Sequence, residues 1–282
     1  MMPAWFHNHA PVEDVPIDDR AFQYGDGLFE TIAIRAGRPR LWQFHLQRLA
    51  SGCERLGIRM PAEQNLREQL DYALDAGNVD AGSGTAKMIL SAGSGPRGYG
   101  RDREIEPRIF VGVFPGNALP GSAYEEGVDA MVCETRLAGP SVLAGLKTLN
   151  RLEQVFGRSE CVAANAFEGL MVDADERVIC GTMSNVFIVI DHTLITPALT
   201  RCGVAGVMRR LVLESFAAND KAVVIRDVTL AELWQSNEVF LSNSQFGVVP
   251  LRRCDDRQWS PGDSTRECQR LLAAQGVQEC AL

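Results

Sequence analysis

Strand-like segments and helical stripes alternate along the first 115 residues. Residues 29–35 (FETIAIR) are β-prone and predict a strand, followed by a turn over 36–39 and a short return strand over 40–42. An apolar residue then recurs every three or four positions, which predicts a helix ending near Gly57: Trp42, Leu46, Leu49, Cys53 and Leu56. The other predicted elements are a helix over 61–74 and strands over 85–91 and 108–114.

The second half of the chain shows a similar mixture. Strands are predicted over residues 127–134, 168–172, 178–180, 185–190, 222–228 and 238–242, and helices over 151–165, 203–217 and 265–274. Between the halves, residues 115–122 (PGNALPGS) are rich in proline and glycine and predict a linker. This order of elements favours the α/β (α+β) class, arranged in two lobes.

Composition narrows the class of protein. The 282 residues are 46% hydrophobic and 23% charged, which is ordinary for a soluble globular protein of one large or two moderate domains. A net charge of −8 and a pI of about 5.1 argue against a nucleic-acid or membrane-surface partner. No apolar run reaches the roughly 18 residues of a membrane span. The eight cysteines and four histidines lack metal-site spacing, so we expect no metal and a reducing, cytoplasmic location without a signal peptide.

Chemistry that needs a lysine amine has three candidates, Lys87, Lys147 and Lys221. Lys147 lies in an apolar stretch, residues 142–150 (VLAGLKTLN). Partial desolvation there would lower the pKa of its amine and make the amine a better nucleophile. From the local pattern alone, a lysine that extends its charge to solvent is the commoner outcome.

Three features offer ligands for an anion. Arg48 lies on the first helix, off its apolar stripe, and residues 203–209 (GVAGVMR) form a glycine-rich turn whose backbone N–H groups are able to hold a phosphate. Residues 241–244 (LSNS) end a strand with hydroxyl and amide donors. Each feature alone is weak evidence, and two of them also have a plain structural explanation, which is a solvated helix face for Arg48 and a tight turn for Gly203 and Gly206.

The loop over residues 94–100 (SGPRGYG) is a candidate substrate contact. Its glycines allow close backbone approach, while Arg97 and Tyr99 offer a cation and a phenol that suit a carboxylate. A flexible connection between two strands explains the same composition equally well.

Taken together and in order, four regions of the chain resemble the fold-type IV pyridoxal-phosphate (PLP) enzymes. They are residues 19–31 (DRAFQYGDGLFET) with 47–49, then 146–155 (LKTLNRLEQV), 178–187 (VICGTMSNVF), and 206–209 with 242–250. The family includes branched-chain and D-amino-acid aminotransferases and aminodeoxychorismate lyases, and the LKTLNRLEQ and PRGY motifs look most like the lyases. The resemblance implies a two-lobed, D-amino-acid-aminotransferase-like architecture and a homodimer. The implied domains are a smaller one over 1–114, a linker over 115–122 and a larger one over 123–282.

The resemblance also implies a role for each motif residue. Lys147 would form the Schiff base with PLP and act as general base. The other cofactor positions are Arg48, the backbone amides of Val207 and Met208, and the hydroxyl of Ser244, all on the phosphate. The substrate positions are Thr31, which would take part in catalysis, and Arg97 and Tyr99.

One position departs from the family pattern. The family places a glutamate, which pairs with the ring nitrogen of PLP, five residues before the asparagine that is Asn185 here, and this chain has Cys180. A thiol has an ordinary pKa of about 8.5 and is a weak hydrogen-bond partner, so the cofactor would be a weaker electron sink. We expect Glu176 to lie on a turn and not to substitute. The alternative is that Cys180 is simply a small buried residue.

Three functions follow as hypotheses. The first is a PLP-dependent lyase that converts 4-amino-4-deoxychorismate to 4-aminobenzoate and pyruvate, with no macromolecular substrate. The second is a class IV aminotransferase acting on branched-chain or D-amino acids. The third is a non-catalytic member of the fold, for which Cys180 would be a sign of decay, although the retained Lys147 and Arg48 argue against it.

Overall fold

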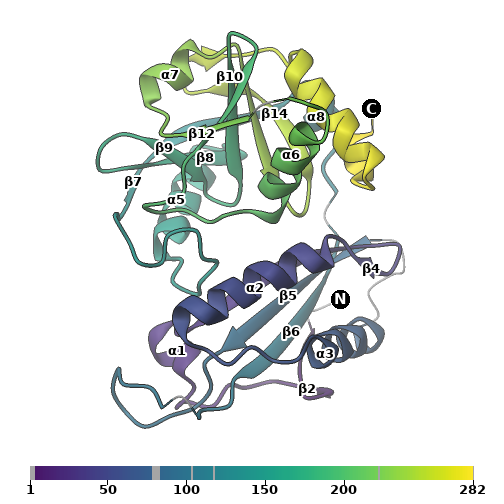
Figure 1. Cartoon of the computed structure of the whole chain (residues 1–282), viewed down its shortest axis with the longest axis vertical. Helices are drawn as coiled ribbons and strands as arrows, with labels where there is room; N and C mark the ends of the chain where they lie inside the picture. The colour runs from purple at the N-terminus through teal and green to yellow at the C-terminus, as the bar shows by residue number, and fades with distance from the viewer. Residues whose placement is uncertain (1–3, 78–82, 103, 117, 222, 282) are drawn as a thin grey trace. The chain divides into compact units, whose positions relative to one another are not determined.

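The computed structural model describes residues 4–77, 83–102, 104–116, 118–221 and 223–281 (Figure 1). Two compact units divide the chain. One consists of Met1–Asn117 with Leu146–Asn150, and the other of Ala118–Gly145 with Arg151–Leu282. The short segment that carries Lys147 therefore belongs to the first unit. The domain boundaries at residues 114 and 123 stay a prediction.

The first unit is an antiparallel six-stranded sheet with helices packed on it. Its elements are β1 (Ala4–His7), β2 (Ala10–Pro11), α1 (Arg20–Tyr24), β3 (Gly27–Arg35), β4 (Arg38–Pro39), α2 (Trp42–Leu56), α3 (Glu63–Ala76), β5 (Ser83–Ser91) and β6 (Arg108–Pro115). The strand order is β2-β1-β6-β5-β3-β4. β3 pairs with β5 along its whole length, from Gly27 opposite Ser91 to Arg35 opposite Ser83.

The packing of α2 against β3 follows from their apolar patterns. Leu28, Ile32 and Ile34 alternate along β3 and are buried in one cluster with the α2 residues Leu46 and Leu49. The predicted strand over 29–35 and the predicted helix are confirmed, and the helix ends at Gly57, whose φ of 65° is left-handed. The predicted return strand over 40–42 is wrong. The chain pairs at β4 instead, because Leu41 takes a left-handed φ of 54° as the N-cap of α2, which begins at Trp42.

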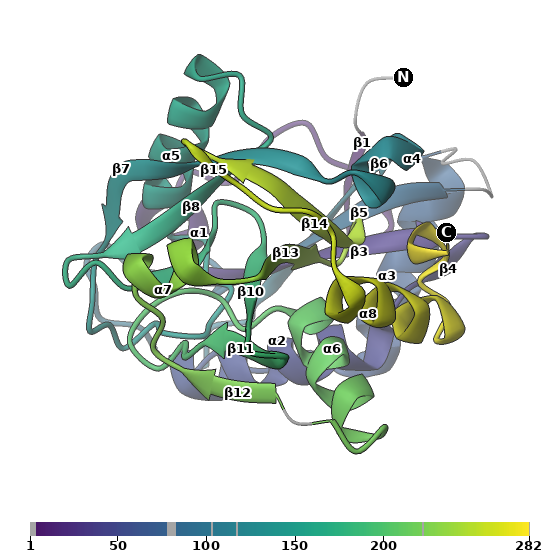
Figure 2. The same ribbon diagram turned by 90° about the horizontal axis from the view of Figure 1, so that it is seen from above.

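The second unit is built on a larger mixed sheet. Its elements are α4 (Gly121–Glu125), β7 (Val128–Leu137), α5 (Leu152–Ala163), β8 (Glu168–Asp173), β9 (Val178–Gly181), β10 (Asn185–Ile190), β11 (Thr193–Pro197), α6 (Val207–Ala217), β12 (Val223–Arg226), α7 (Leu230–Gln235), β13 (Glu238–Asn243), β14 (Gly247–Cys254), β15 (Arg257–Gln258), α8 (Asp263–Ala274) and a short 3₁₀ helix (Gln278–Cys280). The strand order is β12-β11-β10-β13-β14-β7-β8-β9, with β15 paired to β14. α5 packs on β7 and β8, and α6 packs beside α8 (Figure 2).

The strands and helices predicted for the second half are confirmed in position, with two differences. The predicted helix over 203–217 begins at Val207, because Val204 forms a parallel bridge to Gly145 and Gly206 keeps an extended backbone. The strand predicted over 222–228 is shorter, and its first residue, Ala222, lies outside the described residues, as does Asn117 of the predicted linker. Among the described helices, none has the length and apolar character to cross a membrane.

Candidate functional site

A buried charge network in the first unit fixes Arg48. Glu30, on β3, accepts hydrogen bonds from Arg48 through Nε at 2.9 Å and through Nη2, and from His45 Nδ1 at 2.5 Å. Burial alone raises the pKa of Glu30, but the charges and hydrogen bonds of Arg48 and His45 outweigh it and lower the pKa to about 2. The carboxylate is therefore ionised at neutral pH. The Arg48 side chain is only 13% exposed, so the alternative of a solvated helix face is wrong.

His45 completes this network from the turn of α2 that precedes Arg48. Burial lowers the pKa of His45, against the opposing effect of Glu30, so the imidazole is neutral at neutral pH. The neutral ring donates a hydrogen bond from Nδ1 to the Glu30 carboxylate but adds no positive charge beside Arg48. Arg48 is thus the cation that Glu30 holds in place.

Lys147 lies against the same strand. The segment Leu146–Asn150 runs alongside β3, with Phe29 N donating to Lys147 O at 3.0 Å. The Lys147 Nζ sits over the Phe29 ring, 4.1 Å from its centroid. Thr31 follows Phe29 on the same face of β3 and is paired in register with Lys87.

A second lysine also approaches Phe29. The Lys87 Nζ is 5.1 Å from the ring centroid, and burial lowers the pKa of its amine. The two lysines therefore share one aromatic side chain, and proximity to Phe29 does not by itself select between them.

In the second unit, the start of α6 is suited to an anion. Val207 and Met208 open the helix, the N-cap is Gly206, and no described side chain caps it. The first turn holds no acidic residue, so the positive end of the helix dipole has no local counter-charge. A Cβ at Gly206 would lie 2.0 Å from Asn185 Oδ1, so this close approach requires glycine.

Cys180 lies on β9, opposite Met171 of β8, in a cluster that is rich in sulfur. Burial, reinforced by the charge of Glu168, raises the pKa of the Cys180 thiol to about 12. The thiol is therefore protonated and neutral at physiological pH. Glu176 follows the turn after β8, with a φ of 57°, and its exposed carboxylate pairs with Arg136 at 3.6 Å.

Ser244 lies in the turn between β13 and β14, also in the second unit. Asn243 Oδ1 accepts from the backbone N–H groups of Gln245 at 2.8 Å and Phe246 at 2.9 Å, which holds this turn in one conformation. Ser244 is thus carried on an ordered turn at the end of a strand.

The predicted substrate loop belongs to the first unit. The Arg97 side chain is exposed and makes no hydrogen bond or ion pair to any residue that the structure describes. Tyr99 is 89% exposed, and its ring centroid lies 5.5 Å from that of Tyr24. The two predicted substrate residues of this loop, Arg97 and Tyr99, are therefore presented to solvent.

The structure groups the predicted residues by unit. The first unit brings Lys147 and Thr31 to β3, holds Arg48 on that strand's Glu30, and also carries Arg97 and Tyr99. The second unit carries Cys180, Val207, Met208 and Ser244.

Sequence reasoning assigned no role to the residues that support these positions. Glu30 and Arg20 lie inside the motif quoted for residues 19–31, and His45 lies just before Arg48. The sequence did contain a signal at Glu30, because this residue lies on the same face of β3 as the buried residues Leu28 and Ile32. A carboxylate on a buried strand face needs a cationic partner.

Comparisons with known proteins agree on one family. A model of the amino-transferase class IV family matches residues 27–254. The chain is 38% identical to an aminodeoxychorismate lyase of Vibrio harveyi, covering 86% of this chain and 89% of the relative, and 27% identical to a D-alanine aminotransferase of Bacillus licheniformis, covering 95% and 93%. It is 46% identical to a solved 4-amino-4-deoxychorismate lyase of Pseudomonas aeruginosa, with a TM-score of 0.88 over 96% of this chain and 98% of the other.

Proposed function

Because the chain belongs to the amino-transferase class IV family, we propose that it is a PLP-dependent aminodeoxychorismate lyase, converting 4-amino-4-deoxychorismate to 4-aminobenzoate and pyruvate. The observation that carries this proposal is the 46% identity to a solved lyase over nearly the whole of both chains. The D-alanine aminotransferase is less similar, at 27% identity. The family is PLP-dependent.

Each unit, taken by itself, carries a feature that would suit the phosphate of such a cofactor. Arg48 is a largely buried cation, 13% exposed, that Glu30 holds, and α6 begins with an uncapped N-terminus and no acidic residue. Both features favour a dianion. Lys147 would hold the aldehyde, and Ser244 would add a hydroxyl to the phosphate site. When bound, PLP supplies an electron sink for the carbon that carries the substrate amine.

The side chains of this chain would move the protons. The Lys147 amine would take the proton from the carbon that bears the substrate amine, since a positioned base replaces a bimolecular encounter. The Lys147 ammonium or the Thr31 hydroxyl would then protonate the departing enolpyruvyl oxygen. Arg97 and Tyr99 would bind a substrate carboxylate from the loop.

The neutral thiol of Cys180 favours elimination over transamination. At the position that the family resemblance gives it, the protonated, buried thiol of Cys180 would not supply the negative charge that keeps a ring nitrogen protonated, and the cofactor would be a weaker electron sink. Loss of pyruvate from aminodeoxychorismate creates an aromatic ring and is strongly downhill. A weak electron sink therefore limits this elimination less than it limits transamination.

We further propose that the protein is a cytoplasmic homodimer. The α5 helix presents an exposed apolar stripe consisting of Leu152, Val155, Phe156 and Val162. Exposed apolar side chains gathered on one face of a helix favour an interface, and a second copy of the chain is the occupant we assign. Sedimentation of the native protein beside a Val155→Glu, Phe156→Glu variant tests this. A dimer in the native protein and a monomer in the variant are expected.

A direct assay tests the lyase proposal. Purified protein with PLP is incubated with enzymatically made aminodeoxychorismate, and 4-aminobenzoate and pyruvate are measured. Equal amounts of both products are expected. Amino-group transfer from D-alanine or branched-chain amino acids to 2-oxoglutarate, without 4-aminobenzoate, would assign the chain to the aminotransferases instead. A colourless protein that PLP does not reconstitute would indicate a non-catalytic member.

A further inference from the structure

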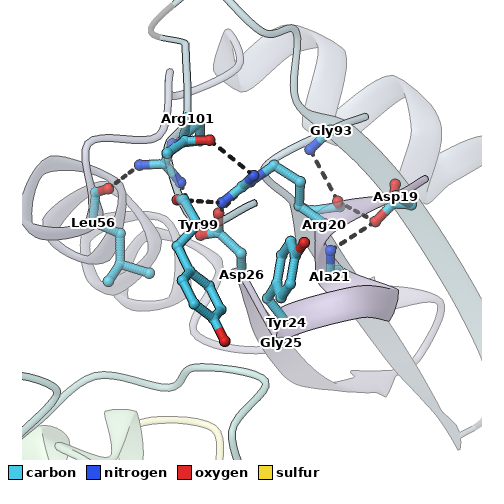
Figure 3. Close-up of polar contacts among 12 residues, drawn as sticks. Asp19, Arg20, Ala21, Tyr24, Gly25, Asp26, Leu56, Gly93, Tyr99 and Arg101 are labelled. Atoms are coloured by element: carbon cyan, nitrogen blue, oxygen red, sulfur yellow. Dashed lines mark hydrogen bonds and ion pairs between the residues drawn. The ribbon is translucent and has the colours of Figure 1, made fainter. Parts of the chain in front are cut away.

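The glycine-rich loop over residues 94–100 is anchored at its tip by a buried side chain. Arg20 opens α1 and is only 4% exposed, and its guanidinium reaches the backbone of the loop (Figure 3). Nη1 donates to the carbonyl oxygens of Gly98 at 3.1 Å and Gly100 at 3.3 Å, and Nη2 donates to that of Tyr99 at 3.0 Å. One side chain therefore holds three consecutive carbonyls.

The Arg20 guanidinium is itself held in place by an ion pair with Asp26. Arg20 Nε donates to Asp26 Oδ2 at 2.8 Å, and the other oxygen of Asp26 accepts from Arg101 Nη1 at 2.8 Å. Arg101 closes the loop and also donates to the carbonyl of Leu56 at the end of α2. Figure 3 shows Asp26 between the two arginines. Asp26 thus links Arg20, which holds the tip of the loop, to Arg101 at the end of the loop.

Tyr24 adds a second anchor on the same loop. Its hydroxyl accepts from Gly98 N at 3.2 Å, and the Arg20 guanidinium carbon lies 5.1 Å from the centre of its ring. Gly98 has a φ of 115°, a conformation that side-chain-bearing residues rarely adopt. The loop therefore has a specified backbone shape, and the alternative of a flexible connection does not describe its tip.

The contrast between the loop backbone and its side chains points to recognition. The backbone of Gly98–Gly100 is held from inside, whereas Arg97 and Tyr99 extend into solvent. Arg97 makes no ion pair within the described part of the chain, although acidic residues are common in this protein. A cation left unpaired on a rigid support loses little conformational freedom when it meets an anion.

We propose that Arg20 is a positioning residue, which fixes the loop so that Arg97 is preorganised to bind a carboxylate of the substrate. This rests on the proposed function, because it takes the substrate to be a carboxylate-bearing small molecule. Arg20 acts through Arg97 and touches neither the substrate nor the reacting atoms. Its contribution is to substrate binding and not to the proton transfers.

The test compares Arg20→Lys with the native holoenzyme. One ammonium cannot span Asp26 and three carbonyls, so amide hydrogen exchange at residues 98–101 is expected to be about tenfold faster. The KM for aminodeoxychorismate is expected to rise about tenfold with kcat changed less than about twofold, because the lost contact is uniform binding energy. The matched control is Arg67→Lys, an exposed α3 residue paired with Asp71, which should change neither quantity.

A double-mutant cycle separates positioning from a general loss of structure. Arg97→Met should raise KM by a similar factor without changing loop exchange, and adding Arg20→Lys to it should raise KM little further, since both act through one contact. Tyr24→Phe removes the hydroxyl that accepts from Gly98 and should give a smaller effect of the same kind. If Arg20→Lys does not fold, hydrogen exchange at residues 98–101 and the KM of Tyr24→Phe test the proposal instead.

The outcomes that overturn the two proposals differ. Unchanged exchange at 98–101 in Arg20→Lys would reject the clamp, and fully additive KM effects of Arg20→Lys and Arg97→Met would reject its action through Arg97. Absence of 4-aminobenzoate from the native enzyme would reject the lyase assignment, while the exchange measurement would still judge the clamp.

Discussion

The two units hold their candidate residues by different physical means. In the first unit, buried ion pairs place the side chains, with Glu30 holding Arg48 and Asp26 holding Arg20. In the second unit, the candidate groups are backbone amides and neutral side chains, which no ion pair of their own places. The amides at the start of α6 are placed by the helix, and the Cys180 thiol is uncharged.

The difference predicts how each unit responds to a change of charge. Removing one member of a buried ion pair leaves an uncompensated charge and is costly. The positions of Arg48 and Arg20 in the first unit should therefore be sensitive to the loss of a charge and to acid. The second unit should tolerate neutral substitutions near Cys180 and be sensitive to the gain of a charge.

The largest expected effect is that of Lys147→Ala. Loss of the positioned base should lower kcat by about 10³-fold or more and should remove the visible absorbance of the lysine-bound cofactor. Lys87→Ala is the matched control, because Lys87 also lies against Phe29. It should keep the absorbance band. A band that survives Lys147→Ala and disappears in Lys87→Ala would move the cofactor to the other lysine.

The next effect is that of Glu30→Gln on stability. The change keeps the shape of the side chain but leaves Arg48 without its counter-charge, at a cost of about 3 kcal/mol in the free energy of unfolding. Glu63→Gln, an exposed α3 carboxylate that accepts from Trp42, should cost less than about 1 kcal/mol. Urea unfolding measures both variants. Added inorganic phosphate should restore more stability to Glu30→Gln than to the native protein, and an equal gain would contradict an anion site at Arg48.

Acid should destabilise the native protein through the same network. The pKa of Glu30 falls from 4.5 to about 2 on folding, so its contribution is full above about pH 4.5 and is lost as the pH falls towards 2. A shift of this size corresponds to about 3 kcal/mol. His45 has the same sign, because burial lowers its pKa from 6.5 and protonation opposes folding. The acid limb below pH 4.5 should be shallower in Glu30→Gln, and an unchanged limb would contradict this origin.

A smaller effect is expected where a charge enters the second unit. Cys180→Glu buries a carboxylate close to Glu168, which should cost about 2 kcal/mol relative to Cys180→Gln, the variant of equal shape. If position 180 takes the role that the family resemblance implies, the new carboxylate would gain a partner in the ring nitrogen of bound PLP. The ratio of transaminase to lyase activity should therefore rise in Cys180→Glu only. An unchanged ratio would end this explanation of Cys180.

The sequence predicted the parts of the fold that have a strong repeating pattern. The α2 stripe and the β3 segment were found because one face of each is almost wholly apolar. β14 was not predicted. It contains Pro250, which pairs in register with Phe240 although proline is uncommon within an interior strand. Arg48 was singled out from its position off the stripe, and its phosphate role, which came from the family resemblance, stays a prediction. Its bond to Glu30, 18 residues earlier, depends on tertiary packing that no local pattern encodes.

The smallest effect is expected from Ser244→Ala, which tests whether charge or a single hydroxyl would govern phosphate binding at the proposed cofactor site. If Arg48 and the α6 amides supply most of the attraction, losing one neutral hydrogen bond should cost about 1 kcal/mol, or roughly a fivefold loss of PLP affinity. Titration of the apoprotein with PLP measures this, with Ser159→Ala on α5 as the control. A loss of affinity greater than about 100-fold would show that the hydroxyl, and not the charged groups, dominates. The Arg48–Glu30 ion pair would then contribute to stability alone. The difference between the two units would no longer extend to cofactor binding.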